Sequence, residues 1–275
     1  MSIGVVLALV SALVWGSGDF VGGVATRRSH QFQVLGLSAL SGMVMLTAFA
    51  LISERMPSAT TIGWAATAGL AGAIGVASLY RGLADAGAAI VAPVAAVVTA
   101  IIPALFTALA VSPPNAMQLV GFVAAIVGVW LVTRTPSQQP ISRTSLMLAL
   151  VAGTGFGTFL ILIAHVEADL VFGPLVVARA VMLIAAVVLM LVRKVALPSP
   201  TSNYVALFAG ALDAGGNVFF VLARQYTRLD VAAVLSSLYP VATVILARIV
   251  WREHVTGSQW AGVLVCLGAV ALMAE

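Results

Sequence analysis

The chain has 275 residues, of which 62% are hydrophobic and 8% are charged. A soluble domain carries about 25% charged residues, so this composition excludes a water-soluble fold and predicts a multi-pass helical protein of a cell (inner or plasma) membrane, with the lipid bilayer around it. A net charge of +4 would suggest nucleic acid as a partner of a soluble protein. Here the arginines lie at the ends of apolar runs, as is typical of membrane flanks, so we expect no nucleic-acid binding.

Ten apolar runs follow one another along the chain. Each is long enough to cross a bilayer, because a spanning helix needs roughly 20 mostly apolar residues. The runs occupy residues 3–25, 32–52, 61–84, 87–110, 117–133, 144–165, 171–192, 203–225, 229–250 and 257–273. We therefore predict an all-α membrane protein with ten transmembrane helices.

The two halves of the sequence repeat each other. A shift of 141 residues places several identical or similar residues in register: Leu7-Ala8-Leu9-Val10 on Leu148-Ala149-Leu150-Val151, Trp15-Gly16 on Phe156-Gly157, Gly69 on Gly210, and Gly75 on Gly216. A competing local shift of 137 aligns 93–103 with 230–240, so the register of the fourth helix stays open. We predict one five-helix repeat over 1–134, a polar joint at 135–143 and a second repeat over 144–275. Because five is odd, the two repeats must be inverted in the membrane.

Charged residues inside predicted spans are costly and usually functional, and four of them stand out as candidates. They are Asp19, Arg179, Asp213 and Arg224. Trp15 lies one turn before Asp19 and shares its helix face. We interpret Asp19 as a cavity residue, the alternative being a carboxylate at a helix end that faces the membrane interface.

A polar helix face is predicted in the second repeat only. Asp213, Asn217, Phe220 and Arg224 are spaced i, i+4, i+7 and i+11, which places them on one face of a helix. The equivalent positions of the first repeat are apolar or small. We interpret the face as the lining of an aqueous cavity. The alternative is an ion pair of Asp213 with Arg179 that only fixes helix packing.

Signals for enzyme chemistry are weak. Gly16-Ser17-Gly18-Asp19 matches the G-x-G-D pattern of intramembrane aspartyl proteases, but those proteases pair it with a Tyr-Asp dipeptide that this chain lacks. The three histidines fall at loops or helix ends without metal-ligand spacing. The single lysine, Lys194, is not part of a phosphate-binding loop. We therefore predict no enzyme, no catalytic residue, no metal and no cofactor.

Basic residues divide unequally between the two sides of the predicted bundle. Nine fall on the side of the joint and three on the side of the termini, while Arg179 lies within a helix. The positive-inside rule then predicts a cytoplasmic joint and external termini.

Two motifs resemble a known family. Trp15-Gly16-Ser17 is similar to its WGS start, and Ser236-Ser237-Leu238-Tyr239-Pro240, followed by Arg252-Glu253 and Gln259-x-x-Gly262, is similar to its end-of-repeat pattern. The family is the EamA-type group of the drug/metabolite transporter superfamily. The first repeat departs from it, because Ser112-Pro113-Pro114 replaces a glutamate-containing turn.

The resemblance implies secondary or facilitated transport of a small metabolite. It places a central cavity among helices one to four and six to nine and leaves helices five and ten peripheral, so the protein would be a monomer or a dimer through these two helices. Family members are usually drawn with both termini in the cytoplasm, opposite to the charge count, so the orientation stays open.

The leading hypothesis is a carrier that works by alternating access. Asp19 or Asp213 would take up a proton, because a carboxylate in a low-dielectric cavity is costly when charged, and Arg179 and Arg224 would contact an anionic group. Both signs of charge suit a zwitterion such as an amino acid. The alternatives are a non-transporting membrane sensor or scaffold and, third, an aspartyl protease. The candidate substrate-binding residues are Trp15, Asp19, Arg179, Asp213, Asn217, Phe220, Arg224 and Tyr239.

Overall fold

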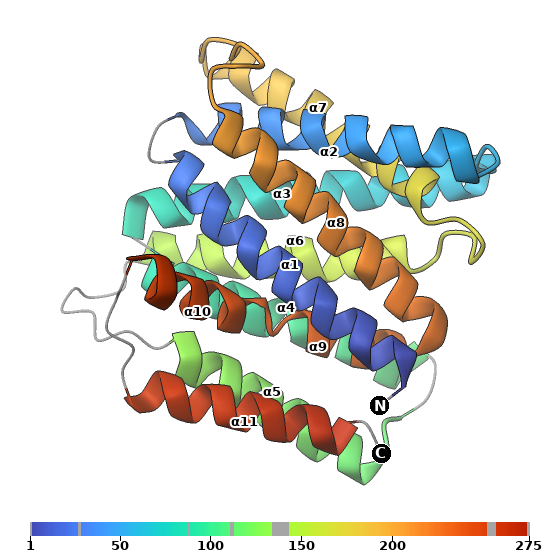
Figure 1. The fold of residues 1–275 in the computed structure, drawn as a ribbon, viewed down its shortest axis with the longest axis vertical. Coiled ribbons are helices and arrows are strands. Elements are labelled where there is room, and N and C mark those ends of the chain that lie inside the picture. The colour runs from blue at the N-terminus through green and yellow to red at the C-terminus, as the bar shows by residue number, and fades with distance from the viewer. Residues whose placement is uncertain are drawn as a thin grey trace.

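The computed structural model describes residues 2–26, 29–86, 88–110, 113–133, 143–251 and 257–273, and these residues form α-helices joined by short connections (Figure 1). The helices are α1 (Ile3–Thr26), α2 (Gln31–Ser53), α3 (Ala59–Ala86), α4 (Ala88–Ala110), α5 (Ala116–Thr133), α6 (Arg143–Ile163), α7 (Phe172–Val192), α8 (Tyr204–Tyr226), α9 (Leu229–Ser236), α10 (Tyr239–Trp251) and α11 (Gly257–Met273). The all-α prediction is confirmed, and nine of the ten predicted runs agree with a helix to within two residues at each end. Most of the predicted joint, residues 135–142, lies outside the described residues.

The prediction of one helix over 229–250 is wrong. The segment is broken between α9 and α10. The N–H of Ser237 bonds to the carbonyl of Ala233, but the N–H of Leu238 turns to Leu235, which tightens and ends the helix. Pro240 has no N–H to continue the pattern, and it lies in the first turn of α10, where that N–H is not needed.

The helices suit a lipid environment. Within the described residues, six of them, α1, α2, α3, α6, α7 and α8, contain a segment long and apolar enough to cross a membrane. Large apolar side chains are exposed along their outer surfaces: Leu51 is 79% exposed and Ile52 is 86% exposed. In water such exposure would be costly, whereas lipid tails accept it. The protein is therefore a multi-pass membrane protein by composition and by surface.

The helix connections gather at two faces of the bundle. We call the face that holds the two chain ends, together with the connections 54–58, 164–171 and 227–228, the terminal face (Figure 1). The opposite face holds the described connections 29–30 and 193–203. The described basic residues follow the division expected from the sequence: Arg81, Arg143, Arg193 and Lys194 lie toward the opposite face, and Arg55, Arg224 and Arg228 toward the terminal face.

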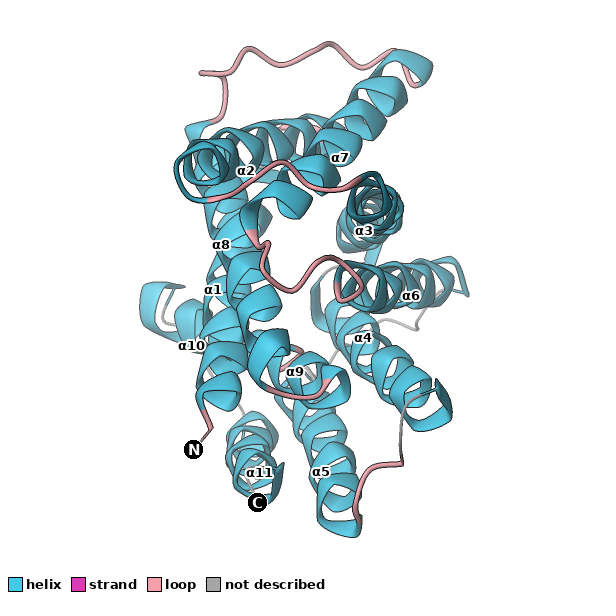
Figure 2. Cartoon of the chain, turned by 90° about the vertical axis from the view of Figure 1, so that its right-hand side faces the viewer, coloured by secondary structure: helices cyan, strands magenta, loops and turns pink. Residues whose placement is uncertain are grey.

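The two halves of the chain are intertwined. Helix α1 packs along α8, and its counterpart α6 packs along α3 (Figures 1 and 2). At the first contact Trp15 lies directly on Gly216, and at the second Phe156 lies on Gly75, where an added Cβ would be 2.7 Å from the ring. These four residues form two equivalent pairs under the 141-residue shift. The sequence repeat therefore reappears as a repeated helix contact.

A second pair of glycines also marks equivalent contacts. A Cβ on Gly69 of α3 would lie 2.5 Å from the carbonyl oxygen of Ala178 on α7. Its counterpart Gly210 of α8 lies against the backbone of Ser38 on α2. Small residues allow such close backbone approach, which is a main source of helix association in lipid.

Gly210→Ala should destabilise the protein measurably. The new methyl group would overlap the carbonyl oxygen of Ser38, and backbone atoms cannot move aside as a flexible side chain can. We expect a loss of about 1–3 kcal/mol, seen as a lower thermal midpoint in detergent. Gly63→Ala is the matched control, because nothing lies within 4 Å of a Cβ there. Equal midpoints for the two variants would contradict this packing.

Helices α5 and α11 form a separate pair at one end of the bundle (Figures 1 and 2). They meet where Gly128 faces Cys266, and a Cβ on Gly128 would lie 2.5 Å from the sulfur. Cys266 is 3% exposed and packs as a small apolar residue. Neither helix contributes a residue to the lining of the central cavity described below.

Candidate functional site

A central cavity lies between helices of both halves. It has an empty volume of about 660 Å³ and is lined from α1, α3, α4, α6, α7, α8 and α10. A second cavity of about 450 Å³ shares part of this wall and adds residues of α2. The added residues include Leu79 of α3 and Ala209 of α8, which lie on the side of the opposite face. The two cavities together extend from the centre of the bundle toward that face.

An ion pair forms part of the cavity wall. The guanidinium of Arg179 on α7 contacts the carboxylate of Asp213 on α8. The Arg179 side chain is 4% exposed, whereas that of Asp213 is 39% exposed and reaches the cavity. The ion pair raised as an alternative from the sequence therefore exists, and both of its members line the cavity. Asn217, one turn along α8, donates its amide N–H to the Asp213 carbonyl at 2.7 Å and lies in the same wall.

Trp15 is held rigidly at the contact of α1 with α8. Its indole N–H donates to the main-chain carbonyl of Asp213 at 3.2 Å, and its ring stacks on Phe220 with centroids 6.0 Å apart. Ser11 of α1 donates to the carbonyl of Gly216 at 2.8 Å, which fixes the same seam one turn away. Trp15 is thus fixed in position by these contacts while it lines the cavity.

Two polar groups of the cavity lack a partner among the described residues. Asp19 of α1 lines both cavities and forms no hydrogen bond or ion pair there. The hydroxyl of Tyr239, at the start of α10, is buried without a hydrogen-bond partner. Both groups lie within electrostatic range of each other, and Asp19 also lies near Asp213. A bound molecule with N–H or O–H groups could therefore satisfy groups that the protein leaves open.

Six of the eight residues predicted for the site line the central cavity: Trp15, Asp19, Arg179, Asp213, Asn217 and Tyr239. Phe220 does not; it is fully buried and supports Trp15 from behind. Arg224 lines neither cavity, although its Nε atom is buried without a hydrogen-bond partner. It shares a helix face with Asp213, but 11 residues at 1.5 Å each place it roughly 16 Å farther along the axis.

Much of the cavity wall was not predicted from the sequence. The remaining lining residues are mostly apolar: Gly72, Val76, Thr99, Phe156, Phe159, Leu160, Leu175, Ala178 and Met182. Such side chains carry no signal that separates a cavity wall from a packed seam. Phe156 is the exception, because the 141-residue shift aligns it with Trp15. Thr99 is the polar member of this set. Its hydroxyl donates to the carbonyl of Ala95 at 2.8 Å, so its hydrogen bond is made within its own helix.

The site carries no sign of metal or protease chemistry among the described residues. No group of three or more His, Cys, Asp or Glu side chains is placed to hold a metal ion there. An aspartyl protease needs two carboxylates that share a proton. Asp19 and Asp213 do line one cavity, but Asp213 is bound to the guanidinium of Arg179 instead.

Comparison with known proteins agrees with the repeat and the fold. A family model described as "EamA-like transporter family" matches the chain twice, over residues 2–134 and 143–274. A solved structure titled "Crystal structure of protein" is similar with a TM-score of 0.77 and 16% identity, covering 99% of this chain and 98% of that chain. This likeness shows the fold alone. No curated protein matches.

Proposed function

The chain belongs to the EamA-like transporter family, and from this premise we propose that it is a secondary transporter that moves a small metabolite by alternating access, with the central cavity as its substrate site. One observation carries the proposal: charged residues from both repeats meet in a single cavity. Inverted repeats support such a mechanism, because two similar halves can exchange conformations and open a midplane site to alternate sides. We place all ten segments, with α9 and α10 counted as one, across the membrane.

The charges of the cavity favour a substrate that carries an ammonium group. Asp213 and Arg179 neutralise each other, which leaves Asp19 as an uncompensated carboxylate. An ammonium group beside Asp19 would restore the neutrality of the cavity and donate to the hydroxyl oxygen of Tyr239. It would also lie against the Trp15 ring, where cation–π attraction adds to binding. An amino acid or a related zwitterion would have to place its carboxylate toward Arg179, which Asp213 already neutralises, so the charge balance favours an amine over a zwitterion. Arg224 has no place in this arrangement.

Protons are the proposed coupling ion. A carboxylate in a largely apolar cavity is costly unless it is protonated or paired. Asp19 would therefore hold either a proton or the substrate ammonium group, but not both. Exchange of one for the other would couple substrate movement to a proton gradient.

A binding and flux experiment tests the proposal. Purified protein is heated in detergent with a panel of amines, amino acids and organic anions. A true ligand at 100 times its Kd stabilises the native state by about 2.7 kcal/mol, which raises the melting temperature. Compounds that stabilise the protein are then measured for counterflow in proteoliposomes.

The two stages distinguish the alternatives. Stabilisation by ammonium compounds together with counterflow supports a transporter with the proposed site. Stabilisation without counterflow supports a membrane sensor or scaffold instead. If anions without an ammonium group are the ligands, the proposed role of Asp19 is wrong, while transport itself can still hold.

A further inference from the structure

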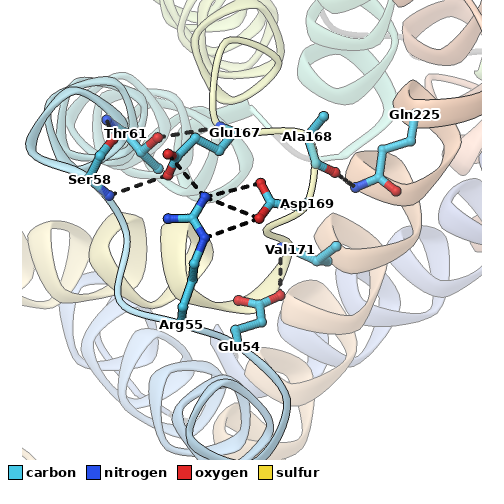
Figure 3. A network of polar contacts seen from close by, with 9 residues as sticks. All are labelled: Glu54, Arg55, Ser58, Thr61, Glu167, Ala168, Asp169, Val171 and Gln225. Atoms are coloured by element: carbon cyan, nitrogen blue, oxygen red, sulfur yellow. Dashed lines mark hydrogen bonds and ion pairs between the residues drawn. The ribbon is translucent and has the colours of Figure 1, made fainter.

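Helix α7 is capped by a residue that directly follows another helix. Glu54, the residue after α2, accepts three main-chain N–H groups at the start of α7: those of Val171 at 2.7 Å, Phe172 at 2.9 Å and Gly173 at 2.7 Å. Figure 3 shows the Glu54 carboxylate turned toward this segment. The contact spans more than a hundred residues of sequence and joins the first repeat to the second.

The sequence at the start of α7 explains why the cap must come from elsewhere. The first N–H groups of a helix have no partner within it, and Val171, at the N-cap position, has no side chain that could accept them. The first turn of α7 also has no acidic residue. The carboxylate of Glu54 supplies both acceptors and a negative charge at the positive end of the helix dipole. Gly173 allows the segment that carries Glu54 and Pro57 to approach the start of α7 closely, since a Cβ at position 173 would lie 3.0 Å from the Pro57 side chain.

A polar network holds the two connecting segments in place (Figure 3). Arg55 donates to Glu167 at 3.2 Å and to Asp169 at 3.2 Å. Glu167 also accepts the main-chain N–H of Ser58 at 3.3 Å, and this hydrogen bond is the main cause that lowers the pKa of Glu167. These ion pairs are exposed and individually weak, but together they orient the segment in which Val171 presents its N–H.

The equivalent end of α2, at the opposite face, is built differently. His30 caps its own helix by accepting the N–H of Phe32 at 3.3 Å, and Gln33 completes a capping box with the N–H of His30. The described residues join α2 to the segment after α7 here by a neutral hydrogen bond, from Gln33 to the carbonyl of Ala196 at 2.9 Å. Separation of α2 from α7 at this face would leave the cap intact.

We propose that Glu54 is a latch between the repeats that holds the terminal face closed. Opening that face would withdraw the carboxylate and leave three N–H groups of α7 without an acceptor, whereas at the equivalent end of α2 the cap belongs to the helix's own segment and the described bond to the segment after α7 is neutral. The two arrangements of an inverted-repeat protein therefore differ in free energy, and the one closed at the terminal face is favoured. Glu54 acts on this equilibrium at a distance from the cavity, since it is not a lining residue.

Side-specific labelling tests the latch. A cysteine is introduced at Leu160, which lines the cavity three residues before α6 ends at the terminal face and is 1% exposed. The native Cys266 is replaced by serine, and a membrane-impermeant maleimide is added from the terminal face. Glu54→Ala should raise the labelling rate at least about tenfold, equivalent to about 1.4 kcal/mol in the opening equilibrium. Glu54→Gln keeps one acceptor oxygen without the charge and should give a smaller rise.

Gln33→Ala is the matched control, because it removes the bond that joins α2 to the segment after α7 at the opposite face. Its labelling from the terminal face should stay at the level of the parent protein. An equal rise in Gln33→Ala, or no rise in a folded Glu54→Ala or Glu54→Gln protein, would overturn the latch. Because labelling needs no substrate, the result is independent of whether the proposed transport function is right.

Discussion

Replacing Asp213 with asparagine should lower the free energy of unfolding by about 3–5 kcal/mol, because it leaves a buried charge unpaired. The charge is the guanidinium of Arg179, whose side chain is 4% exposed. Asparagine can offer one carbonyl oxygen but cannot neutralise it. Transport should also be lost, since the freed guanidinium of Arg179 would compete with the substrate ammonium group for Asp19, which lines the same cavity.

A double variant separates the ion pair from the rest of the site. Asp213→Asn combined with Arg179→Met removes both charges, and removing both members of a buried pair is often close to neutral for stability. Thermal midpoints in detergent should therefore recover in the double variant, while counterflow in proteoliposomes stays lost. A single Asp213→Asn protein with the parent's midpoint would contradict the energetic role of the pair. Unchanged flux would contradict its role in transport.

Replacing Asp19 with asparagine should have the opposite profile, with little change in stability and a large loss of activity. Asp19 has no protein partner among the described residues, so removing its charge breaks no bond. A hydrogen bond to a charged group is worth about 1.5–3 kcal/mol, so uptake should fall by about 10- to 150-fold. The remaining uptake should no longer depend on pH, because the group proposed to exchange protons is gone.

The measurement is uptake of a stabilising ligand into proteoliposomes under imposed pH gradients. Asp169→Asn is the matched control, because this carboxylate lies outside the cavity, is 62% exposed and forms a surface ion pair of at most about 1 kcal/mol. Its uptake should stay close to that of the parent protein. Full, pH-dependent uptake by the Asp19→Asn protein would remove Asp19 from the mechanism.

The helices could be predicted from apolar runs because lipid leaves the backbone almost no alternative. Every N–H and C=O group in a bilayer must bond within its own segment, so a long apolar run becomes a helix. The break at Ser237 and Leu238 could not be predicted in the same way. Pro103 lies within the unbroken helix α4, so a proline in a run does not by itself indicate a break. At the break, Ser236 donates to the carbonyl of Ala8 on α1 at 3.3 Å, a contact between distant segments.

The candidate site could be predicted only where it is polar. Charges inside apolar runs indicated Asp19, Arg179 and Asp213, because lipid makes such residues costly. Helical spacing then extended the site too far along α8, since a shared face says nothing about how far the cavity reaches. Phe220 therefore turned out to support the wall and Arg224 to lie beyond it. The apolar wall depends on which helices pack together, and only the internal repeat pointed to Phe156.

The intertwining of α1 with α8 also has a consequence for how the protein is made. Helix α1 is complete at Thr26, but its partner begins only at Tyr204. At a synthesis rate of about 5–20 residues per second, roughly 10–40 s pass before that partner emerges. During this interval the small residues on the inner face of α1 meet lipid or other proteins instead of Gly216. A ribosome that stops after the first repeat would thus release a chain whose helices lack their packing partners from the second repeat. Such a chain would be a natural substrate for membrane quality control.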